Sequence, residues 1–445
     1  MAPSSAQNAS DKQKRVLSGM RPTGRLHIGH YFGALQNWVD LQNSADHECF
    51  FFVADWHALT TDYADTSGVA QNSIEIATDW LAAGLDPEKC TMFLQSAVRE
   101  HAELHLLLSM ITPLGWLERV PTYKEALENI KDKDLHQYGF LGYPVLQTAD
   151  IVMYGEPGQE LAVPVGEDQV SHIELSREIV RRFNTFYSID ISRDLYLPEH
   201  RKDLQKFASG LGAPDISQLG WGHEIAQIHF EKNIKDFVKA IGYENALGHL
   251  EASVRRYLSS ETLLMEPEPL LTRTPRIPGT DGRKMSKSYG NFISLSESDD
   301  SIRTKTRAMM TDPARKRRSD PGNPDVCPVF DWHKLFPEEQ TPEKRARVDR
   351  ISLACRTAEI GCVECKGLMA EALIQWIEPV RARREQFAAD PDAVLDILGD
   401  GSAKARGVAR KTMARVREAV FGWEKTQLNL AEANLAAKTA KETGR

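Results

Sequence analysis

Two short segments far apart in the chain carry side chains that suit a nucleoside triphosphate. The first is His27-Ile28-Gly29-His30, and the second is Lys284-Met285-Ser286-Lys287-Ser288. Imidazole N–H groups, lysine cations and hydroxyl groups bind phosphate oxygens, and they stabilise the charge that develops when an α-phosphate is attacked. Each segment taken alone is short enough to arise by chance, so neither is sufficient evidence by itself. The two in this order predict the activation of a carboxylate by ATP, with Mg²⁺ sharing the phosphate charge.

The first segment follows a predicted strand and opens a predicted helix, so its backbone N–H groups and the helix dipole favour an anion. His27 and His30 share one helix face, and Gly29 leaves room for a nucleoside. A zinc site is an alternative, but no nearby carboxylate or third histidine completes it. A purely structural role is another. For the lysine segment, the alternative is an exposed charged turn.

The elements around these segments follow an alternating pattern. Short apolar runs at 16–18, 49–54, 92–95 and 163–165 predict strands, and amphipathic stretches between them predict helices. This alternation is typical of a doubly wound, Rossmann-type α/β domain with a parallel sheet. Such folds bind ligands beyond the carboxyl ends of the strands, where residues 19–30 and 55–57 fall.

The order of segments predicts several parts. We expect a flexible arm (1–14), the Rossmann-type domain with a helical connective segment (15–185) and an inserted helical subdomain (186–270). The lysine loop and the return to the first domain (271–300), an all-helical domain (301–430) and a flexible tail (431–445) follow.

Charge and hydropathy restrict the partners of the chain. The net charge is −8 over 445 residues, but basic residues gather between 303 and 356, which suits either a nucleic-acid surface or a solvated face. No apolar run approaches the roughly 18 residues of a membrane span, and the first residues lack the apolar core of a signal peptide. We therefore expect a cytoplasmic protein without a membrane partner.

Longer motifs resemble the bacterial-type tryptophanyl-tRNA synthetases, which are class I aminoacyl-tRNA synthetases. They are Ser18-Gly19-Met20-Arg21-Pro22-Thr23-Gly24, Asp55-Trp56-His57-Ala58-Leu59-Thr60, Tyr143-Pro144-Val145-Leu146-Gln147-Thr148-Ala149-Asp150-Ile151, Val163-Pro164-Val165-Gly166-Glu167-Asp168-Gln169, His172-Ile173-Glu174-Leu175 and the lysine segment. The resemblance implies ATP, Mg²⁺, L-tryptophan and tRNA(Trp) as partners, a tryptophanyl-adenylate intermediate, anticodon binding by the helical domain and a homodimer.

The resemblance also implies roles for single residues. Asp150 is expected to accept the indole N–H, and Tyr143 and Gln169 to bind the substrate ammonium. Catalytic roles fall to His27, His30, Lys284, Lys287 and Ser288. ATP contacts fall to Arg21, Pro22, Thr23, Gly29, His30, Gly166, Glu167, Asp168, Ile277, Lys284, Met285, Ser286, Lys287 and Ser288.

Two positions of the expected pocket each allow two interpretations. His57 suits a pocket wall or a satisfied core histidine. Gln147 stands where family members often have an apolar methionine, so either the pocket floor is more polar here or this side chain points away.

Four late cysteines form a separate group: Cys327, Cys355, Cys362 and Cys365. Their chemistry suits a [4Fe-4S] cluster or a four-thiolate zinc site, and only one spacing is as short as those that zinc sites usually pair. A group without metal is the third alternative. A subset of the tryptophanyl-tRNA synthetases with a [4Fe-4S] cluster in the C-terminal domain resembles this pattern, which implies a cluster that staples the helices.

Three other functions remain as alternatives. A tyrosyl-tRNA synthetase shares the fold and both motif types, but the 143–150 and 163–169 segments fit the tryptophan enzymes better. A nucleotidylyltransferase with the histidine motif and without tRNA would lack the basic C-terminal helices. A silent RNA-binding paralogue would be expected to lose charged motif residues, and none is missing.

Overall fold

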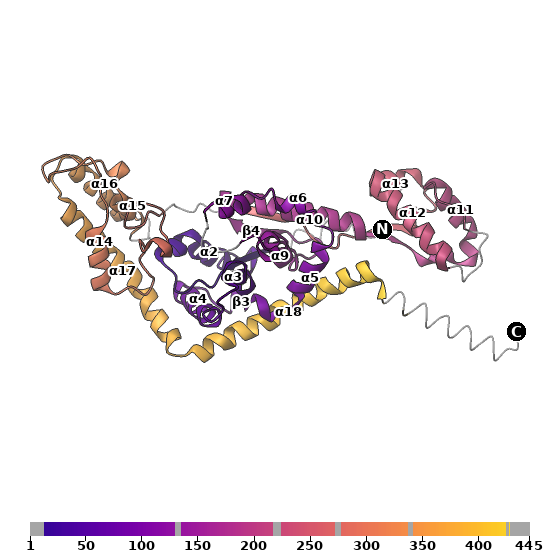
Figure 1. The fold of residues 1–445 in the computed structure, drawn as a ribbon, viewed down its shortest axis with the longest axis horizontal. Coiled ribbons are helices and arrows are strands. Elements are labelled where there is room, and N and C mark those ends of the chain that lie inside the picture. The colour runs from indigo at the N-terminus through magenta and orange to yellow at the C-terminus, as the bar shows by residue number, and fades with distance from the viewer. Residues whose placement is uncertain are drawn as a thin grey trace.

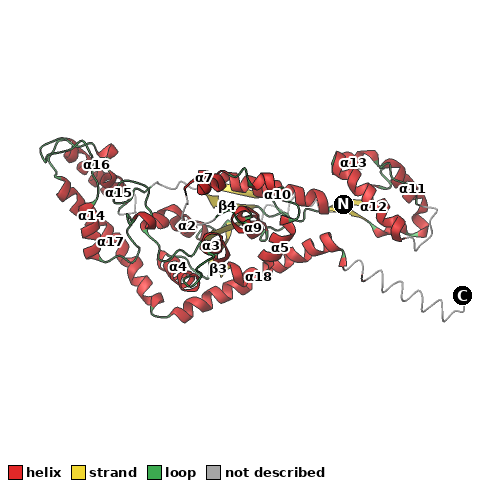
Figure 2. Ribbon diagram, viewed as in Figure 1, coloured by secondary structure: helices red, strands yellow, loops and turns green. Residues whose placement is uncertain are grey.

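A five-stranded parallel sheet lies at the centre of the computed structural model, which describes residues 13–129, 135–216, 224–271, 277–336, 341–423 and 427. The strand order β3-β2-β1-β4-β7 confirms the doubly wound α/β class (Figure 1 and Figure 2). The strands are β1 (Lys14–Met20), β2 (His47–Val53), β3 (Cys90–Leu94), β4 (Leu161–Val165) and β7 (Pro267–Leu271).

Strand β2 shows why the sheet is buried on both sides. Its side chains alternate between two cores, with Phe51 entering one and Phe50 and Phe52 the other. Helices fill out these two cores. They are α1 (Ile28–His30), α2 (Gln36–Gln42), α3 (Asp55–Asp62), α4 (Val69–Ala83), α5 (Glu100–Ser109), α6 (Leu114–Leu117), α7 (Pro121–Asn129), α8 (Tyr138–Leu141), α9 (Tyr143–Val152) and α10 (Val170–Tyr187).

Strand β7 was not predicted from the sequence. It contains Pro267 and Pro269, and proline cannot donate a hydrogen bond to a neighbouring strand. The sequence of this segment is therefore not typical of a central strand. The structure places it at the edge of the sheet, where proline is tolerated.

Between α10 and β7 the chain leaves the sheet and builds a third core of its own, which includes Phe207 and Phe230. An antiparallel pair of strands forms the stem of this part, which lies at the opposite end of the molecule from the helices between residues 299 and 388 (Figure 1). Its elements are β5 (Ile189–Ile191), β6 (Leu258–Ser260), α11 (Arg201–Gly210), α12 (Glu224–Ile241) and α13 (Tyr243–His249).

The C-terminal region is helical, as predicted. Its elements are α14 (Asp299–Ala308), α15 (Pro328–Leu335), α16 (Pro342–Arg356), α17 (Cys362–Ala388) and α18 (Pro391–Phe421). The last of these helices turns back along the sheet, where the Leu94 N–H of β3 donates to Ser402 Oγ at 3.2 Å (Figure 1). Within the described residues, none of the helices combines the length and the apolar character that a membrane crossing requires.

Candidate active site

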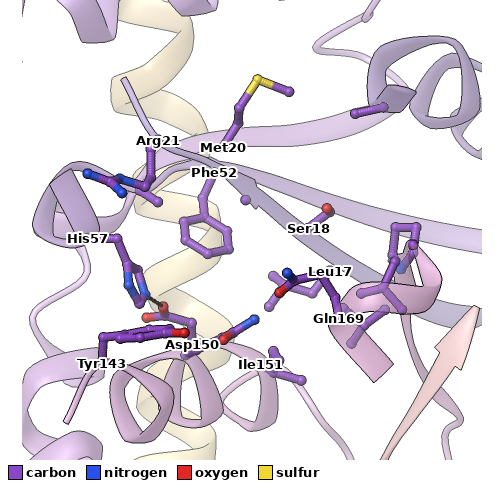
Figure 3. Close-up of a pocket in the computed structure, with 18 of the residues that line it drawn as sticks. Leu17, Ser18, Met20, Arg21, Phe52, His57, Tyr143, Asp150, Ile151 and Gln169 are labelled. Carbon is purple, nitrogen blue, oxygen red and sulfur yellow. Dashed lines mark hydrogen bonds and ion pairs between the residues drawn. The ribbon is translucent and has the colours of Figure 1, made fainter. Parts of the chain in front are cut away.

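A cavity of about 620 Å³ opens at the carboxyl ends of β1 and β4, the edge at which parallel α/β sheets bind ligands. Its size suits a small molecule. Side chains from these strand ends, from α3 and from α9 face into it (Figure 3). Of the residues singled out in the sequence, those that line the cavity are Arg21, His57, Tyr143, Gln147, Asp150, Gly166 and Gln169.

The carboxylate of Asp150 is the most buried polar group of the cavity wall, with its side chain only 1% exposed. His57 Nε2 lies 2.8 Å from Oδ2 and His101 Nδ1 2.6 Å from Oδ1, while Gln95 Nε2 donates to both oxygens at 2.8 Å (Figure 3 shows the His57 contact). Burial raises the pKa of Asp150, but the hydrogen bonds from His101 and His57 outweigh it and lower this pKa to about 2. The carboxylate is therefore ionised at neutral pH.

A second chain of hydrogen bonds holds the neighbouring wall. Tyr143 Oη lies 2.7 Å from Thr122 Oγ1, which lies 2.9 Å from His172 Nε2. The other nitrogen of His172 lies 3.0 Å from Gln147 Oε1, so Nδ1 carries the proton in this contact. Gln147 thus lines the cavity, and its carbonyl is fixed by His172.

Arg21 closes the cavity on the side of α3. Its guanidinium donates to the hydroxyl of Thr61 and lies 3.5 Å from the carboxylate of Asp62. Burial lowers the pKa of Arg21, although the Asp62 charge opposes this effect. A half-buried cation with one weak ion pair is available to an anionic or π-electron partner.

The two histidines of the first motif lie together at the start of α1. Their rings stack with centroids 3.6 Å apart, and the His27 backbone N–H donates to His30 Nδ1 at 3.2 Å, which leaves His30 Nε2 as a donor. Burial lowers the pKa of His27 to about 4 and that of His30 to about 3, with smaller contributions from neighbouring cations. Both rings are neutral at pH 7.

The lysine segment meets the first motif through Lys287. Its Nζ donates to the carbonyls of Thr23 at 2.7 Å and Gly24 at 3.0 Å, and burial lowers the pKa of this lysine. Lys284 is exposed, and the Ser286 N–H donates to Asn291 Oδ1 at 2.8 Å. Two segments more than 250 residues apart thus form one cluster next to the cavity.

Three residues expected near ATP serve the packing of this cluster. Met285 and Ile277 are buried in the core, and a Cβ at Gly29 would lie 2.9 Å from the His27 ring. Gly29 therefore makes room for the imidazole. Pro22 is buried, while Thr23 and Glu167 are exposed. The side chains of Asp168 and Ser288 lie outside the described residues.

Sequence reasoning gave no role to several residues that hold the cavity. His101 is fully buried, and its Nε2 lies 2.7 Å from the hydroxyl of Tyr154. Gln95, Thr122 and His172 complete the two hydrogen-bonded walls. The sequence signals are that Gln95 ends a predicted strand and His101 comes shortly after it, where site residues of this fold class fall, and that His172 belongs to one of the motifs of the resemblance.

The four late cysteines come from the ends of three helices. Cys327 precedes α15, Cys355 lies near the end of α16, and Cys362 and Cys365 open α17. Burial, with smaller contributions from the other three thiols, raises the pKa of Cys365 to about 12, so all four interact electrostatically. Within the described part of the chain, no three or more Cys, His, Asp or Glu side chains are close enough to hold a metal ion.

Comparison with known proteins gives a consistent result. The family model "tRNA synthetases class I (W and Y)" matches residues 9–200 and 247–378. A tryptophan–tRNA ligase of Ralstonia nicotianae is 45% identical, covering 92% of this chain and 98% of the relative, and one of Thermotoga maritima is 43% identical, covering 91% and 98%. The crystal structure of the Campylobacter jejuni tryptophanyl-tRNA synthetase with ADP and tryptophan is 27% identical, with a TM-score of 0.65 over 91% of this chain and 99% of that one.

Proposed function

The chain belongs to the class I tRNA synthetase family that acts on tryptophan and tyrosine, and from this membership we propose that it is the tryptophan–tRNA ligase. It joins L-tryptophan to ATP as tryptophanyl-adenylate and then transfers the amino acid to tRNA(Trp). The names of the relatives and the site favour this function over the tyrosine-specific one and over a nucleotidylyltransferase without tRNA.

The observation that carries the choice of tryptophan is the ionised Asp150 carboxylate in the cavity wall. A carboxylate offers about four lone-pair positions, and the three donors present make four contacts with them, because Gln95 donates to both oxygens. Of these donors, His57 is the one that borders the cavity. The indole N–H of tryptophan takes its place on Oδ2, whereas a phenylalanine ring has no hydrogen to donate.

The second cluster binds the triphosphate. His30 offers its Nε2–H, and Lys287 exchanges its contacts with the Thr23 and Gly24 carbonyls for phosphate oxygens. The Lys284 ammonium and the Ser286 hydroxyl add donors. When bound, Mg²⁺ would share the phosphate charge with these residues. Both motifs stabilise the charge that grows on the α-phosphate as the carboxylate attacks.

Amino-acid-dependent exchange of pyrophosphate into ATP tests this function. Exchange with tryptophan is expected to exceed exchange with tyrosine and, by about 10⁴-fold or more, exchange with phenylalanine, because a ring that leaves the buried Asp150 carboxylate without its donor is rejected by that factor. Exchange with tyrosine alone, or with neither amino acid, would contradict the proposal.

The four cysteines hold a [4Fe-4S] cluster in this proposal. This proposal is supported by the position of the four thiols at the ends of three helices, where each of the other three affects the pKa of Cys365. Bound iron and sulfide in anaerobically purified protein would support the cluster. Zinc alone, or no metal, would refute it.

Exposed cations near the cysteines are the proposed anticodon surface. Other members of the basic run are occupied, as in the pairs of Arg303 with Glu371 and of Arg356 with Asp325. Lys316, Arg317, Arg345 and Arg350 are exposed. Replacing these four by glutamine is expected to lower aminoacylation of tRNA and to leave pyrophosphate exchange intact, since only the first reaction involves the anticodon. Equal loss of both activities would exclude this surface.

A homodimer in the cytoplasm completes the proposal. Leu106 (53% exposed), Met110 (71%) and Leu114 (61%) form an apolar stretch over the end of α5 and the start of α6. Apolar surface of this kind marks contact sites. Sedimentation should give twice the monomer mass, and a monomeric mass at micromolar concentration would contradict the dimer.

A further inference from the structure

The backbone just before His27 is held by a buried carboxylate that no motif includes. The Leu26 N–H donates to Asp79 Oδ2 at 2.5 Å. Asp79 lies in α4, and its side chain is 1% exposed. A charged acceptor makes this a strong hydrogen bond, and it fixes the chain one residue before the imidazole.

The other oxygen of Asp79 is bound from the C-terminal region. Arg384 of α17 donates its Nε to Asp79 Oδ1 at 2.6 Å, and its Nη2 also contacts Glu75. Glu75 in turn accepts from Arg25 Nε at 3.0 Å. Arg25 and Leu26 are therefore both tied, through one carboxylate each, to the same guanidinium.

The same helix also supports the segment that follows the lysine motif. Arg381 donates to the Glu297 carbonyl at 2.8 Å and pairs with Asp299 at 2.6 Å. This segment in turn pairs with the first motif, since the Ile28 N–H donates to the Ile293 carbonyl at 3.0 Å. One face of α17 thus contacts the supports of both nucleotide-binding segments.

We infer that Arg384, acting through Asp79, is a positioning residue for ATP: it sets where α17 holds the loop that carries His27 and His30. The inference rests on the proposed function. Arg384 lies beyond residue 378, where the match to the family model ends. The cavity does not include Asp79 or Arg384, and the effect should therefore fall on ATP and spare tryptophan.

The test is tryptophan-dependent pyrophosphate exchange by full-length Arg384→Met. The KM for ATP should rise about 10- to 100-fold, the equivalent of one lost charged hydrogen bond, while the KM for tryptophan stays within about twofold. Arg417→Met is the matched control. It breaks another arginine pair between the C-terminal region and the sheet domain, with Glu103, and should leave both constants unchanged.

Arg384→Met leaves a buried charge unpaired, which endangers folding. The double variant Asp79→Asn, Arg384→Gln removes both charges and should show the same selective rise. An unchanged KM for ATP in a folded double variant, or an equal rise for ATP and tryptophan, would overturn the inference. Absence of exchange in the unmodified protein would instead refute the proposed function.

Discussion

At the scale of single residues, the site depends on groups whose charge is set by their surroundings. Asp150 stays ionised in a fully buried place because three donors face it, while His27 and His30 stay neutral because burial disfavours their charged forms. The cavity thus offers one fixed negative charge to the amino acid. The neighbouring cluster offers neutral donors and a lysine to the triphosphate.

Asp150→Ala should raise the KM for tryptophan about 100-fold in pyrophosphate exchange and change the KM for ATP no more than a few-fold. The variant removes the acceptor for the indole N–H. It also leaves His57, His101 and Gln95 without their shared acceptor, and each buried donor left unpaired costs about 1–3 kcal/mol. Asp65→Ala, at an exposed carboxylate, is the control. A parallel loss of tryptophan and ATP binding would show that the pocket lies elsewhere.

The two depressed histidine pKa values predict acid sensitivity. The unfolded chain binds protons at these positions near pH 6.5, and the folded chain only near pH 4 and pH 3. Between these values the unfolded state holds more protons, so stability falls as the pH drops from 6.5 toward 3. His27→Asn with His30→Asn should therefore lose less stability than the unmodified protein between pH 7.5 and pH 5.0, measured as the urea midpoint. His229→Asn, which changes an exposed histidine, should show the same shift of the urea midpoint between pH 7.5 and pH 5.0 as the unmodified protein.

At the scale of elements, the start of α1 depends on a glycine for its packing. Gly29→Ala places a methyl group 2.9 Å from the His27 ring and 3.4 Å from Met285 Sδ. Displacing that ring should lower the rate of adenylate formation about 5- to 150-fold, which corresponds to a cost of about 1–3 kcal/mol. Gly407→Ala in α18, where a methyl group meets nothing within 4 Å, should leave the rate unchanged. Equal rates in both variants would refute the role given to Gly29.

The elements also show how far sequence reasoning reaches. Strands β1 to β4 were predictable because each is an apolar run between turn residues. The fifth strand, β7, was not predictable because its two prolines are unusual in a strand. Asp150 was recognisable because it belongs to a long motif. His101 is a single histidine on a helix without local pattern, and Asp79 and Arg384 are 305 residues apart, so their contacts could be found only in three dimensions.

At the scale of the whole molecule, α17 and α18 join distant parts. The first carries two of the four cysteines at one end and Arg384 toward the other, a span of about 30 Å at 1.5 Å per residue. The second continues past the sheet to α5, where Arg406 pairs with Glu100 and Arg417 with Glu103. The C-terminal region is thereby bound to the sheet domain from its β3 edge to α5.

The course of α18 also protects the protein against self-association. An exposed edge strand recruits strands of other molecules, and β3 is one edge of this sheet. Gly401 brings α18 so close that a Cβ there would lie 1.8 Å from the Met92 carbonyl, and Ser402 occupies the Leu94 N–H. At the opposite edge, Pro267 and Pro269 lack N–H groups. A chain ending at residue 390 should therefore form β-rich aggregates that bind thioflavin, and Gly401→Leu should do so more slowly. If the shortened chain and Gly401→Leu both remained soluble at high concentration, α18 would not be what prevents association at the β3 edge.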